Sequence, residues 1–482
     1  MMIKLEVLRG YVVAYVYLGV VLLISFGISR IFKNNELSRN IVHIAAGMGW
    51  NIYKWFFPAT IHPIIISSTF VAITLLTIKK KVAFVERQDG SLGTVYFTLV
   101  MLLMSVAGFK NSLLFNLFGI SIMCLSLGDA LANIIGSRYG SIKIYKEKSL
   151  QGAFGCFMAC AVVIMGTSRI YGLGIGITET IILSILCTFT ELFSGSFDNI
   201  AIPSVTYLFG YILMTDGITK GLLISFAVGI AMFFFAKGLQ LLNTGASYML
   251  SYFIAALFYY GGIRSYVSLM IVFSIIILIE KVFGKKTNTV TESINKEFGE
   301  RNEMQLVANC LAAVVMICIY GTTGNAAFLI GFYAAIAETI GDSAASDLGV
   351  LSKHEPVDIC TLKTIQRGIS GGVSLLGTCA GLGVCVISGI TYLAIFKGTW
   401  IGVADIIIAA FLGIILDSVI GSTIQAQYFC DICGTFTEKT VHCGTETKLV
   451  KGWAYIDNSK VNIICNILAC VFASGSYFLL TR

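Results

Sequence analysis

An aspartate, Asp129, lies near the end of a long apolar stretch, in the segment GDALANIIGSRYGSIKIYKEKSLQG at 128–152. An ionisable group inside a membrane-spanning segment is energetically costly and usually has a function. Lys143 and Lys148 follow in the same segment. Phosphoryl transfer needs a carboxylate for Mg²⁺ and cations for phosphate. We therefore predict that Asp129 is catalytic and binds the metal, and that both lysines bind a nucleotide, although the spacing is not that of a P-loop.

Small residues share one face of this segment if it is helical through Gly140. Gly128, Gly136 and Gly140 recur at multiples of four residues, and Asn133 lies beside this stripe. Small residues allow phosphate to approach the backbone, which makes these four positions candidates for nucleotide binding. The same spacing also suits the close packing of two membrane helices, so both interpretations are open.

Two further stretches could complete the site. In ELFSGSFDNIAIP at 191–203, Glu191 and Asp198 flank a glycine-containing turn, which suits metal binding or general-base catalysis on a hydroxyl group. In ELSRNIVHIAAG at 36–47, His43 could act at a lipid headgroup. We predict that these three side chains are catalytic. The alternatives are a solvated turn and a histidine packed at the membrane interface.

A second Gly-Asp pair stands in AETIGDSAASDLGVLSK at 337–353. Glu338 and Asp342 are four residues apart and share a helix face, whereas Asp347 points elsewhere. Three carboxylates at the end of a membrane span are too costly to serve packing alone. We predict that all three bind Mg²⁺ and that Asp342 is catalytic.

Cations and glycines follow this second acidic motif. Lys353 and Arg367 could neutralise phosphate, and Gly371 and Gly372 precede an apolar run in RGISGGVSLLGT. Glycines before a helix can present backbone N–H groups to an anion, so these four residues are candidates for nucleotide binding. Helix capping and solvated loops are the alternative for any single member.

A polar loop near the C-terminal end has the pattern Cys430-x2-Cys433-x8-His442-Cys443. Three thiols and one imidazole can form a closed structural Zn²⁺ site. The alternative is a compact loop with reduced cysteines. A disulfide framework is not expected, because the cytosol is reducing.

Apolar segments must position all of these groups. The 482 residues are 57% hydrophobic and 12% charged, about half the charged share of a soluble domain. Apolar runs of about 18 residues or more, with few or no charged residues, recur, for example at 11–29, 219–236 and 401–421, and each is typical of a membrane-spanning helix. The first run has no small-residue cleavage site, so no cleavable signal peptide is expected. We predict an all-α, polytopic integral membrane helical bundle with about sixteen transmembrane helices.

The charge distribution predicts the orientation of the chain. Most of the 33 Lys and Arg residues fall in loops on one side of the predicted spans, which makes that side cytoplasmic. The acidic and glycine-containing motifs lie on the same side, so we expect active sites that face the cytoplasm. Because the net charge of +7 resides in these short loops, it indicates topology and not nucleic-acid binding.

The chain divides into two halves, 1–240 and 241–482, at the short turn QLLNTG. The first half resembles the CTP-dependent polyprenol kinases, which include dolichol and phytol kinases and are related to phosphatidate cytidylyltransferases. The stretches that carry the resemblance are ELSRNIVH, DGSLGTVYF, GDALANIIGSRYG followed by KSLQG, and ELFSGSFDNIAIP. It implies transfer of the CTP γ-phosphate to a long-chain isoprenoid alcohol. Gln151 stands where that family usually has a carboxylate, so it is given no metal role.

The second half resembles a membrane protein family that contains transmembrane protein 19 and the chloroplast phytyl-phosphate kinases. The stretches that carry this resemblance are AETIGDSAASDLGVLSK, RGISGGVSLLGT, DSVIGSTIQAQYFCDICG, VHCGTETKLVKGWAYIDN and RNEMQLVAN. It implies phosphorylation of an isoprenyl monophosphate to the diphosphate. The positions that it carries over are Glu338, Asp342, Asp347, Lys353, Gly371 and Gly372.

These observations together predict an Mg²⁺-dependent lipid kinase that phosphorylates phytol, geranylgeraniol or a polyprenol with CTP, and then the resulting monophosphate. The expected partners are the isoprenoid alcohol, its monophosphate, a nucleoside triphosphate and the bilayer, without nucleic acid. One alternative is a lipid-phosphate cytidylyltransferase. Another is a polytopic transporter, which also has intramembrane carboxylates and two halves, although here the acids gather at one face.

Overall fold

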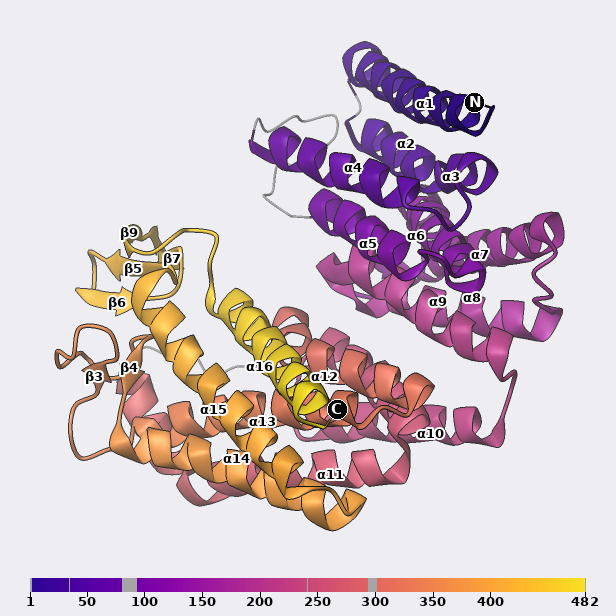
Figure 1. Ribbon diagram of the computed structural model, residues 1–482. Coiled ribbons are helices and arrows are strands. Elements are labelled where there is room, and N and C mark those ends of the chain that lie inside the picture. Colours follow the sequence, from indigo (N-terminus) through magenta and orange to yellow (C-terminus); the bar gives the residue numbers. More distant parts are fainter. Residues whose placement is uncertain (1, 34, 80–92, 241, 294–300, 482) are drawn as a thin grey trace. The chain divides into compact units, whose positions relative to one another are not determined.

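The computed structural model describes residues 2–33, 35–79, 93–240, 242–293 and 301–481, and these residues are mainly helical. They form two compact units, Met1–Leu223 and Ile224–Arg482 (Figure 1). Nine of the described helices are long and apolar enough to cross a membrane, and two shorter apolar helices cover His62–Thr77 and Gly93–Ala107. The predicted all-α polytopic membrane fold is confirmed. Other predicted spans fall on shorter helices or on a helix with three carboxylates.

The first unit is built around one long central helix, α6, with fifteen buried residues. Asn111 caps its N-terminus by accepting a hydrogen bond from the Leu114 N–H. Helix α6 packs against α7, α9 and α2. The elements of this unit are α1 (Met2–Phe32), α2 (Asn35–Met48), α3 (Trp50–Phe56), α4 (His62–Lys79), α5 (Gly93–Ala107), α6 (Ser112–Tyr139), β1 (Lys143–Tyr145), β2 (Lys148–Ser149), α7 (Leu150–Tyr171), α8 (Ile177–Phe193), the 3₁₀ turn Gly195–Phe197 and α9 (Asp198–Thr215).

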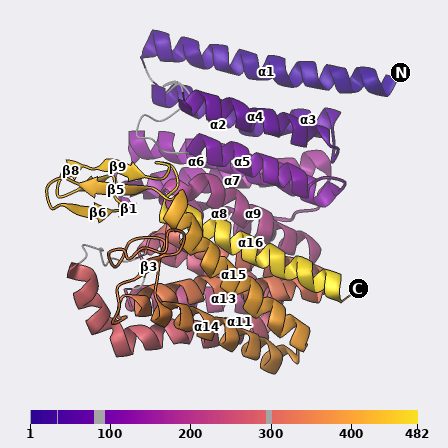
Figure 2. The same ribbon diagram turned by 60° about the vertical axis from the view of Figure 1, so that its left-hand side comes forward.

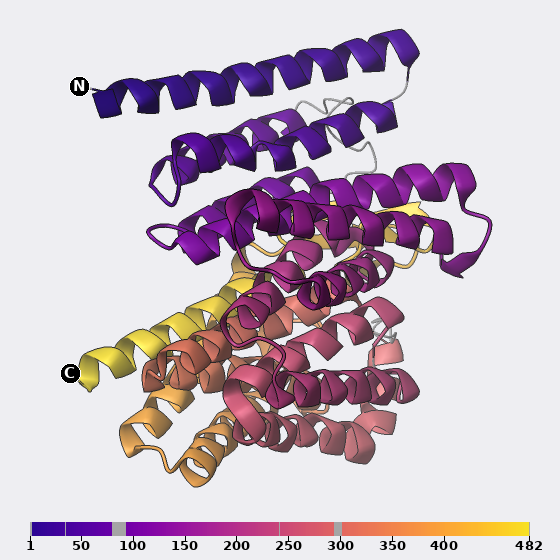
Figure 3. The same ribbon diagram turned by 90° about the vertical axis from the view of Figure 1, so that its right-hand side faces the viewer.

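Helix α1 lies at the margin of the first unit, beside α2 (Figures 2 and 3). Only 17% of its apolar window is buried by the rest of the unit. Because the exposed side chains of α1 are almost all apolar, this helix is suited to contact lipid.

The second unit is built around α13, which packs against α11, α12, α14, α15 and α16. Its helices are α10 (Lys220–Gly238), α11 (Thr244–Ser293), α12 (Glu303–Thr323), α13 (Ala326–Gly349), α14 (Leu375–Phe396), α15 (Trp400–Thr423) and α16 (Asn458–Leu480). Helix α11 is broken at Gly262, whose φ of +66° favours glycine, so it contains two of the predicted spans.

Short strands connect the helices of the second unit at one end of α15 (Figure 1). The strands β5 (Gln427–Cys430), β6 (Thr435–Thr437) and β9 (Lys448–Lys451) form an antiparallel sheet in the order β6-β5-β9. Two antiparallel pairs accompany it, β3 (Val357–Asp358) with β4 (Gly372–Val373), and β7 (Val441–His442) with β8 (Thr445–Glu446).

The boundary between the compact units lies within α10, before the sequence-based division at 240. Helix α10 contacts α11 at two described points: Gly229 lies against the backbone of Ser251, and the Tyr266 hydroxyl is 3.5 Å from the Met232 sulfur.

Candidate functional site

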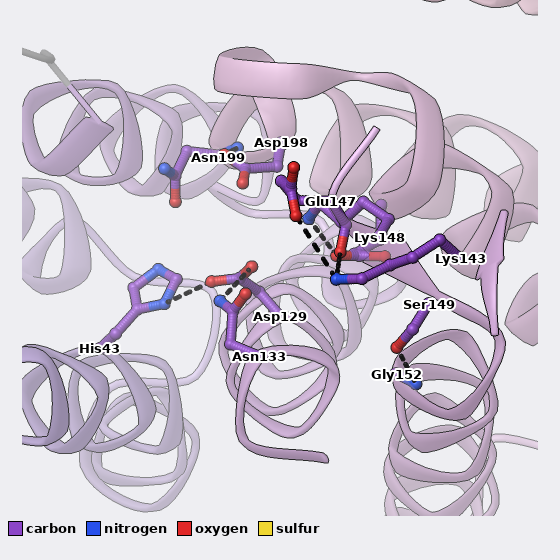
Figure 4. Close-up of polar contacts among 11 residues, drawn as sticks. His43, Asp129, Asn133, Lys143, Glu147, Lys148, Ser149, Gly152, Asp198 and Asn199 are labelled. Carbon is purple, nitrogen blue, oxygen red and sulfur yellow. Dashed lines mark hydrogen bonds and ion pairs between the residues drawn. The ribbon is translucent and has the colours of Figure 1, made fainter. Parts of the chain in front are cut away.

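The first unit gathers several predicted site residues at the ends of α6, α8 and α9. Figure 4 shows His43 and Asn133 pointing toward Asp129. The Asn133 Nδ2 donates to Asp129 Oδ1 at 3.0 Å, and His43 Nδ1 lies 3.9 Å from Asp129 Oδ2. The Phe97 ring packs on the imidazole, with 4.5 Å between ring centroids. The structure therefore places His43 beside the carboxylate, from a helix far away in sequence.

Lys148 forms an ion pair with Glu191, whose side chain is only 1% exposed. Burial would lower the pKa of Lys148, but the Glu191 carboxylate outweighs it, and Asp129 and Asp198 also act to raise that pKa. Three carboxylates therefore favour the charged form of one ammonium group, and Glu191 contacts it directly. We call Asp129, Lys148, Glu191 and Asp198 the first carboxylate cluster. Its excess negative charge fits a divalent cation, which proteins bind through carboxylate oxygens.

A short β-hairpin positions Lys148 in this cluster. The strands β1 and β2 pair, and Ser149 then caps α7 by accepting a hydrogen bond from the Gly152 N–H at 3.2 Å. Lys143 is engaged within the same hairpin, because its Nζ donates to the Glu147 carbonyl at 2.7 Å and its ion pair with the Glu147 carboxylate is largely exposed. The two predicted phosphate-binding lysines thus have different surroundings.

The glycine stripe of α6 lies against α7. A Cβ at Gly128 would be 3.1 Å from the Cys160 sulfur, and a Cβ at Gly136 would be 3.2 Å from the Ser149 hydroxyl oxygen. A Cβ at Gly140 would be 2.7 Å from the same hydroxyl. Helix packing therefore accounts for the small size of these residues, and their role in nucleotide binding remains a prediction. In the stretch DGSLGTVYF, residues 89–92 lie outside the described part of the chain.

The second unit contains a cluster that also has one buried carboxylate. Glu338 is 2% exposed, and its Oε2 accepts a hydrogen bond from Asn466 Nδ2 at 2.8 Å. Asp417 of α15 interacts electrostatically with both Glu338 and Asp342. The Asn462 amide, turned with its nitrogen toward Asp417, donates to Asp417 Oδ2 at 3.2 Å. We call Glu338, Asp342 and Asp417 the second carboxylate cluster.

Asp417 is a polar residue at a later span end to which the sequence analysis assigned no catalytic or metal-binding role. It lies near the C-terminal end of an apolar run, in DSVIGST, as Asp129 does in its own helix. This position in the sequence could have identified Asp417 as a candidate site residue. The amide partners Asn462 and Asn466 carry no such signal, because only the packing of α16 against α13 and α15 brings them to the acids.

Asp347, the third predicted metal ligand of this half, lines a cavity of about 340 Å³ bounded by α10, α11, α12 and α13. Most of its wall is apolar and includes Phe235, Leu250, Phe253, Phe273, Ile276 and Phe332. Its polar lining includes Arg301, Asn309, Thr339, Ser343 and Asp347. Thr339 connects the two regions, because it lines the cavity and its hydroxyl oxygen lies 2.9 Å from the Asn466 amide that donates to Glu338.

The predicted nucleotide-binding loop of the second unit is held by its own contacts. Arg367 forms an ion pair with Glu355 at 3.3 Å and donates to the Val350 carbonyl at 3.2 Å. Gly371 has a φ of +88°, and a Cβ there would lie 2.6 Å from the Ser422 backbone. The Gly372 N–H donates to the Ile369 carbonyl. These contacts account for the conformation of the loop. Phosphate binding remains a prediction for Arg367, Gly371 and Gly372, and also for Lys353, which is exposed.

Two groups of three or more metal-binding side chains have their ligand atoms within 4.8 Å of one another in the described residues. One is the predicted zinc set Cys430, Cys433, His442 and Cys443. The other is a buried trio, Cys124, Cys160 and Cys187, between helices of the first unit. The acids Glu338, Asp342 and Asp347 do not form such a group, but Mg²⁺ is often held by only one or two carboxylates together with substrate phosphates.

Comparison with known proteins identifies relatives among membrane proteins. Protein PGR of Arabidopsis thaliana is 29% identical over 207 residues, which cover 37% of this chain and 70% of that protein. An uncharacterized membrane protein of Methanocaldococcus jannaschii is 28% identical over 182 residues, or 36% of this chain and 69% of the relative. A Glycine max protein named probable phytol kinase 1, chloroplastic, is 29% identical over 151 residues, or 28% of this chain and 49% of the relative.

No solved structure matches the chain. The family described as integral membrane protein DUF92 matches residues 220–470, which is more than half of the chain. The carboxylate cluster of the second unit and the cavity beside it lie within this match. The chain therefore belongs to the integral membrane protein family DUF92.

Proposed function

We propose that this protein is an integral membrane lipid kinase that transfers phosphate from CTP to an isoprenoid alcohol and then to the resulting monophosphate. The observation that carries the proposal is the pairing, in the second unit, of an apolar cavity with a carboxylate cluster through Thr339. An apolar chain can occupy the cavity while its polar end stays near the acids. The partial similarity to a protein named as a phytol kinase supports the same substrate class.

We assign the first phosphorylation to the first carboxylate cluster. Asp129 and His43 lie side by side, so either is placed to accept the proton that the attacking hydroxyl group loses. Lys148 supplies a positive charge that favours the γ-phosphate. Mg²⁺ bound with CTP would neutralise the remaining phosphate charge, and Asp129 and Asp198 are the residues that would hold it.

We assign the second phosphorylation to the second carboxylate cluster. The apolar wall of the cavity would bind the isoprenoid chain and keep water from it. Arg301 at the polar lining would pair with the monophosphate. Asp342 and Asp417 would hold Mg²⁺ with the nucleotide. Both clusters face the cytoplasm in this proposal, because CTP is found there.

The test is a product assay with the purified full-length protein in nanodiscs, supplied with CTP, Mg²⁺ and phytol or geranylgeraniol. We expect isoprenyl monophosphate, then diphosphate, with CDP as the by-product. Release of pyrophosphate with a CDP-linked lipid would instead indicate cytidylyl transfer. Absence of any lipid product from either alcohol, with ATP, GTP and UTP also tested, would refute the kinase proposal.

A further inference from the structure

The polar segment between α15 and α16 brings two short hairpin turns together. The first follows β5 and carries Cys430 and Cys433, where the Gly434 N–H donates to the Cys430 carbonyl at 2.9 Å. The second joins β7 to β8 and carries His442 and Cys443. Cys443 has a φ of +50°, an uncommon conformation for a residue with a side chain. Each turn thus presents two donor groups on a constrained backbone.

The four donor atoms have the spacing of a tetrahedral metal site. His442 Nδ1 lies 3.4 Å from the Cys433 sulfur and 3.3 Å from the Cys443 sulfur. All four donor atoms lie within 4.8 Å of one another. Zinc bound tetrahedrally at usual bond lengths would separate a sulfur from a nitrogen by about 3.6 Å and two sulfurs by about 3.8 Å. The cysteines are free thiols in the structure, so no disulfide explains their approach.

This segment has almost no core of its own. Its strands contain two to four residues each, and large apolar side chains such as Ile432, Val441 and Val450 are more than half exposed. One aromatic pair, Phe429 with Phe436, packs across the sheet at 5.3 Å between centroids. A segment this small usually needs a disulfide or a bound metal to hold its fold.

We propose that Cys430, Cys433, His442 and Cys443 bind one structural Zn²⁺ ion, and that this ion fixes the segment 427–451 against the glycine loop 368–373. Four protein ligands fill the coordination sphere, which is typical of a structural site and not of a catalytic one. The inference does not depend on the proposed kinase activity.

Glu438 connects the zinc segment to the glycine loop. It accepts hydrogen bonds from the Ser370 hydroxyl and, at 3.1 Å, from Gln425 Nε2. Lys451 of the same segment lies 3.9 Å from Asp358, which belongs to β3, the strand that pairs with β4 of the glycine loop. Loss of the metal would free both contacts, so Glu438 acts as a positioning residue for the loop.

The direct test is the metal content of the full-length protein, purified in reducing buffer without chelator and measured by plasma mass spectrometry. We expect about one zinc per chain, and loss of that zinc in Cys433→Ser and Cys443→Ser. Cys360→Ser and Cys379→Ser, which replace exposed cysteines outside the set, should keep it. Because a variant can fail to fold, the wild-type protein is decisive. Less than about a tenth of a zinc per chain, with no tetrahedral cobalt spectrum after reduction and Co²⁺ addition, would overturn the proposal.

The positioning role has a separate test by limited proteolysis. Trypsin cuts after lysine and arginine, and Lys363 and Arg367 both lie shortly before the glycine loop. We expect faster cleavage there after zinc is removed by a chelator, and also in Glu438→Ala with its zinc retained. Glu446→Ala, at an exposed position of the same segment, is the matched control. Equal cleavage rates with and without zinc would refute the positioning role.

Discussion

The two carboxylate clusters differ in what compensates their charge. In the first unit a lysine, Lys148, forms an ion pair with buried Glu191 and lies near Asp129 and Asp198. In the second unit, Glu338 accepts hydrogen bonds from the Asn466 amide and the Thr339 hydroxyl, and Asp417 accepts one from the Asn462 amide. Amides and hydroxyls satisfy hydrogen bonds but do not cancel charge. We therefore expect the second cluster to depend more strongly on a bound divalent cation than the first, which already contains part of its own counter-charge.

The largest effect is expected from Asp417→Asn. If the second cluster holds the metal, removing this carboxylate should lower phosphorylation of the isoprenyl monophosphate at least about a hundredfold. Formation of the monophosphate from the alcohol should stay unchanged, because that step belongs to the other unit. Initial rates with each substrate supplied separately measure both steps. Asp457→Asn is the control, since asparagine also caps a helix well.

That prediction sharpens the comparison because it concerns a residue whose acidic neighbours are known only from the packing of α13 and α15. If Asp417→Asn phosphorylated the isoprenyl monophosphate at the wild-type rate, the electrostatic interaction of Asp417 with Glu338 and Asp342 would play no part in catalysis.

Removal of the lysine should destabilise the first unit. Lys148→Met leaves the Glu191 carboxylate buried without its partner, which we expect to cost about 3–5 kcal/mol of unfolding free energy. The double variant Lys148→Met with Glu191→Gln should recover much of that loss, because no charge is left alone. Denaturant titration in detergent, followed by circular dichroism, gives the values. A double variant as unstable as the single one would contradict the charge-compensation argument.

A smaller effect is expected at the glycines where α6 and α7 meet. It tests whether helix packing, as opposed to phosphate binding, accounts for their small size. Gly152→Ala would place a Cβ 2.8 Å from the Ala132 carbonyl oxygen and 3.3 Å from the Gly136 Cα, so we expect a loss of about 1–3 kcal/mol in stability. Gly166→Ala, in the same helix, has nothing within 4 Å and should be neutral or slightly stabilising. The same denaturation assay measures both. Equal stability of the two variants would mean that α6 and α7 are not closely packed there.

The smallest effect concerns acid sensitivity near the glycine loop of the second unit. Burial would raise the pKa of Asp358, but hydrogen bonds from Ser422, Thr361 and Cys360 lower it to about 2, from the usual 3.8. A lowered pKa means that the stabilisation is complete above pH of about 4 and is lost as the pH falls through about 2. Melting temperatures measured across this range should fall in the wild type. The fall should be shallower in Asp358→Asn, and identical profiles would contradict the assignment.

The sequence predicted the helices well, because long uncharged runs have few alternatives to a membrane span. It also predicted which face carries Asp129 and Asn133, since four-residue spacing determines the face of a helix. It did not predict that Lys148 pairs with Glu191, because the two are 43 residues apart and meet only through the β1–β2 hairpin. The glycine stripe of α6 was visible, but its packing partner on α7 was not.

In the second unit too, contacts between residues far apart in the sequence could not be predicted. Asp417 could not be joined to Glu338 without knowing that α13 and α15 pack together. By contrast, the cysteine and histidine spacing already indicated one metal site, because the two pairs are each nearly contiguous in sequence and need only one fold-back to meet.

The most direct test of the central claim, that each unit performs one phosphorylation, compares Asp129→Asn with Asp342→Asn. Each purified variant is given CTP and Mg²⁺ with either the isoprenoid alcohol or its monophosphate, and the lipid products are separated and quantified. We predict that Asp129→Asn converts only the monophosphate, while Asp342→Asn converts only the alcohol and accumulates monophosphate. If either variant lost both reactions although it folds, or lost neither, the account of two separate sites would be contradicted.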